Sequence, residues 1–182
     1  MHHPPTALST STTAAADGRL TIVLIESGRD DIIDRLICTG ALDRARSAGV
    51  HLHLERPPAA TAAAQRELLG GVTRSWAGSV VLVPTRYDDL EGAVRAAHDR
   101  EVPVIVAGAP RPASDNGLAW SFVSSAAEGD AVAAAIEVGR VAVDAAMDAG
   151  LGRRDAARDH VITPDSRHEY DPSEASPVAC SS

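Results

Sequence analysis

The sequence predicts an α/β domain built on a doubly wound parallel sheet of five strands. Short apolar runs such as Val80–Val83 and Val104–Val106 have the length of strands and lie next to prolines. An amphipathic segment of helical period separates these two runs, as in a βαβ crossover. Aromatic residues are only 3% of the chain, although hydrophobic residues make up 45%. A core of small and branched aliphatic side chains suits a parallel sheet covered by helices on both faces.

The predicted elements follow one another along residues 20–150. Thr21–Ile25 is the first buried strand, and Asp30 or Asp31 can cap a helix that runs to about Ala48, with Gly49 at the end that tolerates positive φ. The further expected elements are a strand at Val50–Leu54, a helix from Thr61 to about Thr73, the strand Val80–Val83, a helix with Leu90, Val94 and Ala97 on one face, the strand Val104–Val106, a strand at Trp120–Ser124 and a helix at Ala126–Ala149. Five strands alternating with helices predict the sheet order 2-1-3-4-5.

The two ends of the chain lack sustained periodicity. We expect residues 1–19 to be a disordered leader and residues 151–182 to be a disordered tail. The leader has no cationic start followed by an apolar run, so we expect no secretory signal and no membrane insertion. We therefore expect a cytoplasmic protein, or a periplasmic or extracellular one if the native start is missing.

Charge and cysteine usage exclude further classes of protein. The net charge of −8 leaves no basic stripe for phosphates, so we expect no nucleic-acid partner. Two cysteines do not make a disulfide framework. Cys38 falls within a predicted helix, and we expect it to be a small buried hydrophobe rather than a reactive thiol.

The predicted fold locates the candidate site. In a doubly wound sheet, ligands bind beyond the carboxyl ends of the strands. The candidate ligand-binding residues in these loops are Ser27, Asp30, Asp31, Thr85, Arg86 and Arg111. Polar groups on converging loops can orient a small polar solute by hydrogen bonds. The same residue types are also ordinary capping and turn residues, and both interpretations remain open.

Known catalytic and cofactor motifs are missing from the sequence. Glu26–Arg29 has one glycine where a dinucleotide fingerprint needs three, and the chain has no Walker sequence and no nucleophile elbow. We predict no enzyme and no cofactor. His51 and His53 are spaced for one face of a strand, which fits a solvated edge better than a metal site because no cysteine or acid follows at zinc-like spacing.

An acidic group after the first strand suggests one further class. Glu26, Asp30 and Asp31 could hold magnesium, as in phosphorylated receiver domains. Such a domain needs a phosphoacceptor aspartate after the third strand, where this chain has Pro84. A receiver-like signalling domain is therefore a lesser alternative.

Several short motifs occur in a recognisable order between Thr21 and Ala149. They are Gly40-Ala41, Gly49, Gln65, Pro84, Asp88, Ala93-Val94, Ala96-Ala97, Val102–Ile105 and Ser121–Val123. Together they resemble the amino-terminal lobe of type I periplasmic binding proteins, the ribose- and galactose-binding class. Sugar-sensing domains of lactose-repressor-type regulators share this fold. The resemblance implies a single lobe that binds a sugar-like solute, as substrate-binding proteins of ABC transporters do.

The chain departs from this family at its binding positions. Asp31–Asp34 stand where the family has Asn-Pro-Phe-Phe, so the aromatic residues that stack on sugars are lost. Gly108 falls on the family's Asp-Arg pair, and Ser125 on its later aspartate. The resemblance adds Asp34, Gly108 and Ser125 to the candidate ligand-binding residues. The chain ends where a second lobe would begin, so we expect a truncated relative, with His160–Thr163 as a remnant of that lobe.

Two classes of function remain. The first is a domain that binds a small sugar-like solute. The alternative is a non-binding structural or interaction module, a degenerate homologue whose lobe face pairs with a second copy or another protein. The loss of the family's Asp-Arg pair favours the second class. The scaffold favours the first class only by analogy of fold.

Overall fold

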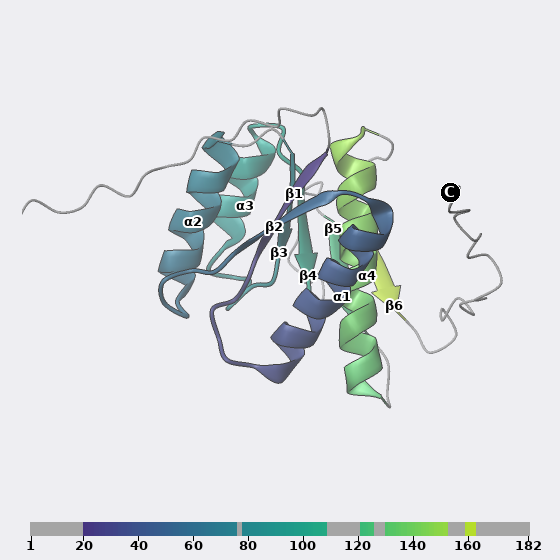
Figure 1. Ribbon diagram of the computed structural model, residues 1–182. Helices are drawn as coiled ribbons and strands as arrows, with labels where there is room; N and C mark the ends of the chain where they lie inside the picture. Colours follow the sequence, from purple (N-terminus) through teal and green to yellow (C-terminus); the bar gives the residue numbers. More distant parts are fainter. Residues whose placement is uncertain (1–19, 76–77, 109–120, 126–129, 153–158, 163–182) are drawn as a thin grey trace, which may run out of the picture.

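A parallel sheet between two helical layers forms the body of the protein (Figure 1). The computed structural model describes residues 20–75, 78–108, 121–125, 130–152 and 159–162. The strands are β1 (Thr21–Ile25), β2 (His51–Glu55), β3 (Ser79–Leu82), β4 (Val104–Ala107), β5 (Ser121–Ser125) and β6 (Asp159–Ile162). The helices are α1 (Ile32–Ala48), α2 (Ala62–Ser75), α3 (Glu91–His98) and α4 (Ala131–Gly150).

The sheet has the order β2-β1-β3-β4-β5-β6, and every neighbouring pair is parallel. The predicted order 2-1-3-4-5 is confirmed for the first five strands. The sixth strand, Asp159–Ile162, lies in the segment predicted to be a disordered tail and overlaps His160–Thr163, which was expected only as a remnant of a second lobe. For these four residues that prediction is wrong. Only Val161 and Ile162 are apolar in this strand, so its sequence lacks the apolar run by which the other strands were predicted. The strand forms by pairing with the open edge of β5.

Capping residues set the ends of two helices. The carboxylate of Asp31 accepts a hydrogen bond from the backbone N–H of Ile33 at 2.8 Å and starts α1, while Gly49 ends it at φ 66°. Gly49 was predicted at this end, and Asp31 was one of the two caps predicted for the start. The expected start of the last helix at Ala126 is wrong, since α4 begins after Asp130. The Asp130 carboxylate accepts from Val132 N at 3.0 Å and from Ala133 N, and an alanine-rich sequence does not reveal which residue caps it.

Alternate side chains of the central strands enter two separate cores. One face of the sheet packs against α1 and α4, and the other packs against α2 and α3 (Figure 1). The first core contains Ile22, Leu24, Val81, Ile105, Ile37 and Val143, and the second contains Val23, Ile25, Val80, Leu82, Leu69 and Val94. Burial on both faces explains why these strands read as continuous apolar runs.

The edge strand β2 differs from this pattern. It lies at the edge of the sheet, as predicted, and begins one residue later than expected. Leu54 is 41% exposed, so solvent reaches a leucine of this strand as well as its polar residues. An edge strand has a neighbour on one side only, which leaves the end of β2 without cover.

Glycines allow α1 and α4 to cross closely. A Cβ atom on Gly40 would lie 1.9 Å from the carbonyl oxygen of Ile136, and a Cβ on Gly139 would lie 1.9 Å from that of Ile37. Neither position can carry a side chain without separating the helices. The crossing holds α1 against the sheet, and α1 forms one side of the candidate site.

No helix in the described part of the chain is long and apolar enough to span a membrane.

Candidate functional site

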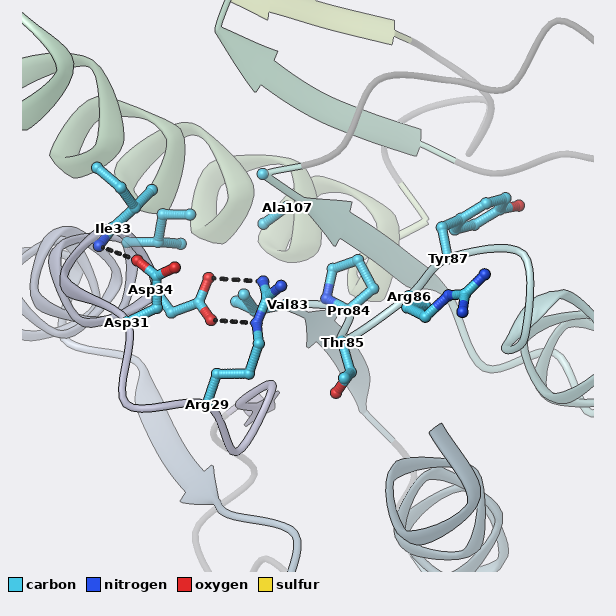
Figure 2. A pocket seen from close by; sticks show the side chains of 12 residues that line it. Arg29, Asp31, Ile33, Asp34, Val83, Pro84, Thr85, Arg86, Tyr87 and Ala107 are labelled. Atoms are coloured by element: carbon cyan, nitrogen blue, oxygen red, sulfur yellow. Dashed lines mark hydrogen bonds and ion pairs between the residues drawn. The ribbon is translucent and has the colours of Figure 1, made fainter. Parts of the chain in front are cut away.

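A pocket of about 390 Å³ opens at the carboxyl ends of β1, β3 and β4 (Figure 2). Its lining residues are Arg29, Asp31, Ile33, Asp34, Ile37, Val83, Pro84, Thr85, Arg86, Tyr87, Ala107 and Gly108. Doubly wound sheets bind ligands at this edge, and pockets of roughly 300–1,000 Å³ hold small molecules. The position and size of the pocket therefore suit a small solute.

The loop after β1 folds around a buried serine. Ser27 is fully buried, and its hydroxyl donates a hydrogen bond to the Asp34 carboxylate in the first turn of α1. The same hydroxyl oxygen accepts the backbone N–H of Arg29 at 3.0 Å. Gly28 makes this turn at φ 78°, a conformation that favours glycine. The turn brings Arg29 and Asp34 together at the pocket.

Arg29 and Asp34 form a bidentate ion pair. Arg29 Nε lies 3.3 Å from Asp34 Oδ2, and Arg29 Nη2 lies 3.5 Å from Oδ1 (Figure 2). The Asp34 side chain is 11% exposed and that of Arg29 is 45% exposed. Since Ser27 also donates to Asp34 Oδ2, both oxygens of this carboxylate have partners. The pair presents an arginine, rather than an open carboxylate, to the pocket.

The loop after β3 is tied to the loop after β1. The hydroxyl of Thr85 donates to the carbonyl oxygen of Ser27 at 2.6 Å. From α2, the fully buried Gln65 donates to the carbonyl oxygens of Val83 at 2.7 Å and Glu26 at 2.8 Å. These bonds satisfy backbone groups where the strands end and fix the two polar loops relative to each other.

Apolar residues complete the walls of the pocket. Ile33 and Tyr87 lie on opposite sides of the polar groups (Figure 2). At the end of β4, Gly108 has φ 83°, and a Cβ atom there would lie 2.9 Å from Ile37 Cδ1. A larger residue at position 108 would therefore be strained and would also press on the floor of the pocket.

Five of the nine predicted ligand-binding residues line this pocket. They are Asp31, Asp34, Thr85, Arg86 and Gly108. Ser27 lies behind the pocket, where it holds Asp34 in place. Asp30 does not line this pocket and pairs with Arg35 at 3.0 Å. Ser125 ends β5, and its side chain lies outside the described part of the structure, as does the whole of Arg111.

Seven of the twelve lining residues were not among the predicted ones, and three of these seven are Arg29, Ile33 and Tyr87. Arg29 directly precedes Asp30 and Asp31 and could have been found as the one cation of the loop from Glu26 to Asp31. Ile33 stands where the resembling family has an aromatic residue, which was a usable signal. Tyr87 gave no signal beyond its place in the loop after β3.

A second, much smaller cavity lies beside Cys38. It measures about 20 Å³ and is lined by Glu26, Ser27, Arg29, Asp30, Asp34, Arg35, Cys38 and Arg56, which is room for about one water molecule. Burial, followed by the nearby carboxylates of Glu26 and Asp34, raises the pKa of the Cys38 thiol to about 12. The thiol stays protonated at neutral pH, so it is a packing residue and not a nucleophile.

The described residues do not gather into a metal site. No three His, Cys, Asp or Glu side chains among them are placed to hold a metal ion. In β2, His53 Nε2 lies 2.8 Å from Glu55 Oε1 on a partly exposed edge. This arrangement pairs the imidazole with a carboxylate of its own strand.

Comparison with known proteins shows the fold. No protein-family model matches the chain, and no curated protein is similar enough to count as a match. Solved structures do match. A solute-binding protein of Actinobacillus succinogenes with bound D-allose has a TM-score of 0.53 and 12% sequence identity. A galactofuranose-binding protein has a TM-score of 0.51 and 14% identity, and a periplasmic ribose ABC transporter protein of Conexibacter woesei has 0.50 and 11%.

The matches extend over most of this chain but only part of each solved structure. They cover 80%, 78% and 80% of this chain, and 58%, 56% and 53% of the three structures, in the same order. The chain thus has the fold of a periplasmic-binding-protein lobe and spans little more than half the length of these proteins. At such low identity the likeness establishes the fold and no residue of the site.

Proposed function

We propose that this lobe binds a small, polar, sugar-like solute in the pocket at the carboxyl edge of its sheet. The pocket itself carries the proposal, because polar groups of two loops converge there between apolar walls. Thr85 and the Arg29–Asp34 pair stand on the polar side, with Ile33 and Tyr87 as the walls. Sugars have polar edges and apolar ring faces, which this arrangement can contact together. The solved structures of similar fold include proteins that bind sugars.

The expected affinity of the lobe is low. The pocket is open on one side, so its hydrogen bonds compete with bulk water and each contributes only about 0.5–1.5 kcal/mol. Two or three such bonds scarcely offset the cost of immobilising a ligand, which is roughly 4 kcal/mol or more. We therefore expect dissociation constants in the millimolar range.

Ligand-observed NMR is suited to such affinities. We would measure saturation transfer from the chain to D-allose, D-ribose and D-galactose. Arg86→Gln removes an exposed charge at the pocket, and Arg95→Gln removes a comparable charge on α3 that pairs with Glu91. Binding that weakens in the first variant and not in the second supports the proposal. The proposal fails if none of the sugars binds, or if both variants behave alike.

A second candidate function is self-association, which two exposed apolar side chains favour. Ile32 is 57% exposed and Val132 is 52% exposed, and they lie in the first turns of α1 and α4, which pack together. The occupant that we consider is a second copy of this chain. Sedimentation should then show dimers at tens of micromolar that the double variant Ile32→Ser/Val132→Ser loses. A strict monomer in this range counts against it.

A further inference from the structure

The acceptors and donors that line the pocket differ in how far they are already used by bonds within the protein. Asp34 accepts from Ser27 and twice from Arg29, so both of its oxygens are used. Asp31 accepts the N–H of Ile33 and is committed to capping α1. The hydroxyl of Thr85 donates its hydrogen bond to the carbonyl oxygen of Ser27. Within the described residues, both oxygens of Asp34, one oxygen of Asp31 and the hydroxyl hydrogen of Thr85 are therefore already engaged.

The guanidinium groups retain donors. Arg29 uses Nε and one hydrogen of Nη2 on Asp34, which leaves both hydrogens of Nη1 and the second hydrogen of Nη2. These remaining hydrogens form the second edge of the planar fork, and such an edge fits a carboxylate with two parallel bonds. Arg86 contacts Asp89 through Nε at 3.5 Å, and its side chain is 74% exposed.

From this balance we propose that the preferred solute is a sugar acid and that Arg29 selects its carboxylate. The inference rests on the proposed function and names the chemical class of its ligand. Arg29 would bind the carboxylate through its free edge, and Ile33 would contact the apolar face of the ring. Arg86 can donate to ring hydroxyls from the opposite loop.

Two further residues position Arg29. Ser27 is fully buried and holds Asp34, which in turn holds Arg29 by two bonds. An arginine fixed in this way loses less side-chain entropy when a ligand binds than a free one does. Ser27 and Asp34 are thus positioning residues, and only Arg29 would touch the carboxylate.

Charge alone would not give this preference. The two arginines and two aspartates that line the pocket cancel, and Asp89 adds a negative charge beside Arg86. The chain also carries a net charge of −8. The selection therefore depends on the paired geometry of short-range bonds to Arg29, so the preference should persist at moderate salt, where long-range repulsion is screened.

The test compares sugars that differ only in the acid group. Saturation-transfer NMR titrations at 150 mM salt, where the Debye length is about 8 Å, would use D-galacturonate against D-galactose and D-glucuronate against D-glucose. We expect each acid to bind about tenfold more tightly than its neutral partner, as for one charge-assisted pair over a neutral one. Arg29→Gln should reduce this ratio to about one, and Arg29→Lys should restore part of it.

Arg35→Gln is the matched control, because Arg35 is an exposed arginine of α1 that pairs with Asp30 outside the pocket. It should leave the ratio unchanged, and thermal unfolding checks that each variant is folded. Equal binding of acids and neutral sugars, or a preference that survives Arg29→Gln, overturns the inference and leaves the proposed function standing. If neither acids nor neutral sugars bind, both are overturned.

Discussion

The side-chain oxygen of Gln65 accepts the backbone N–H of Thr85 at 2.9 Å. The amide nitrogen of the same side chain donates to Val83 O and to Glu26 O. One buried residue of α2 thereby satisfies three backbone groups in the two loops that form the pocket. Its role explains why a polar side chain lies at 0% exposure among the buried residues.

Loss of the Gln65 amide should destabilise the protein. Gln65→Leu keeps the size of the side chain but leaves two carbonyls and one N–H without their partners, at a cost of about 1–3 kcal/mol for each group that stays dry. We expect urea unfolding to show a loss of at least about 2 kcal/mol. Arg66→Leu, at the next and exposed position of α2, should change stability by less than about 0.5 kcal/mol. Equal effects of the two variants would contradict this role.

The crossing of α1 and α4 gives a second prediction. Gly139→Ala places a Cβ atom in the position now 1.9 Å from Ile37 O, so the helices must move apart. We expect a loss of roughly 1–3 kcal/mol in the free energy of unfolding. In α3, a Cβ on Gly92 meets nothing within 4 Å. Gly92→Ala should therefore be neutral or stabilise the protein by up to about 1 kcal/mol. A stable Gly139→Ala variant would show that the crossing is looser than described.

The sequence was sufficient for the fold where the physics is local. Buried strands produce apolar runs, and caps such as Asp31 and Gly49 are single residues with a conformational reason. The sequence was insufficient where an element is stabilised by a contact with another part of the chain. The strand β6 depends on the open edge of β5, and the start of α4 on one carboxylate outside the apolar pattern. The limits of the lobe at residues 20 and 150 stay a prediction.

The site was predictable in position but not in detail. Topology places loops at one sheet edge, so Asp31, Thr85 and Gly108 could be expected there. Topology does not say which side chains turn inward. Ser27 donates its hydrogen bond to Asp34, and Asp30 pairs with Arg35. Such local hydrogen bonds and ion pairs decide the orientation of these side chains.

The Cys38 thiol should be unreactive in the folded protein. Its pKa is raised from 9.0 to about 12, chiefly by burial. Iodoacetamide at pH 8 should label it only when urea unfolds the chain, measured in a Cys180→Ala variant so that the other cysteine is removed. Fast labelling of the folded protein would contradict the burial of this residue.

The same shift of Cys38 has a consequence for stability. A group that holds its proton more tightly when folded contributes stability that is complete below its unfolded pKa and is lost as pH rises through its folded pKa. For Cys38 this loss begins near pH 9 and extends toward pH 12. The difference in unfolding free energy between the parent and Cys38→Ala should therefore be constant below pH 9. Above pH 9 it should move steadily against the parent.

Ile33 offers the most direct way to strengthen the pocket. It lines the site with 37% of its surface exposed, so a larger ring at this position has room to face the solute. Ile33→Trp supplies a flat apolar surface, and stacking on an aromatic ring contributes about 1 kcal/mol, or roughly fivefold in affinity. We expect neutral sugars, which should bind the parent chain only in the millimolar range, to bind this variant about fivefold more tightly in NMR titrations.

The neighbouring isoleucine provides the control. Ile32 is more exposed, at 57%, and does not line the pocket. Ile32→Trp adds the same ring to the same turn of α1 but directs it elsewhere, so it should leave sugar affinity unchanged. A gain that appears equally in both variants would mean that sugars stack on any exposed tryptophan of the surface. A gain confined to Ile33→Trp requires that the solute lie against α1, inside the pocket formed by the loops after β1 and β3.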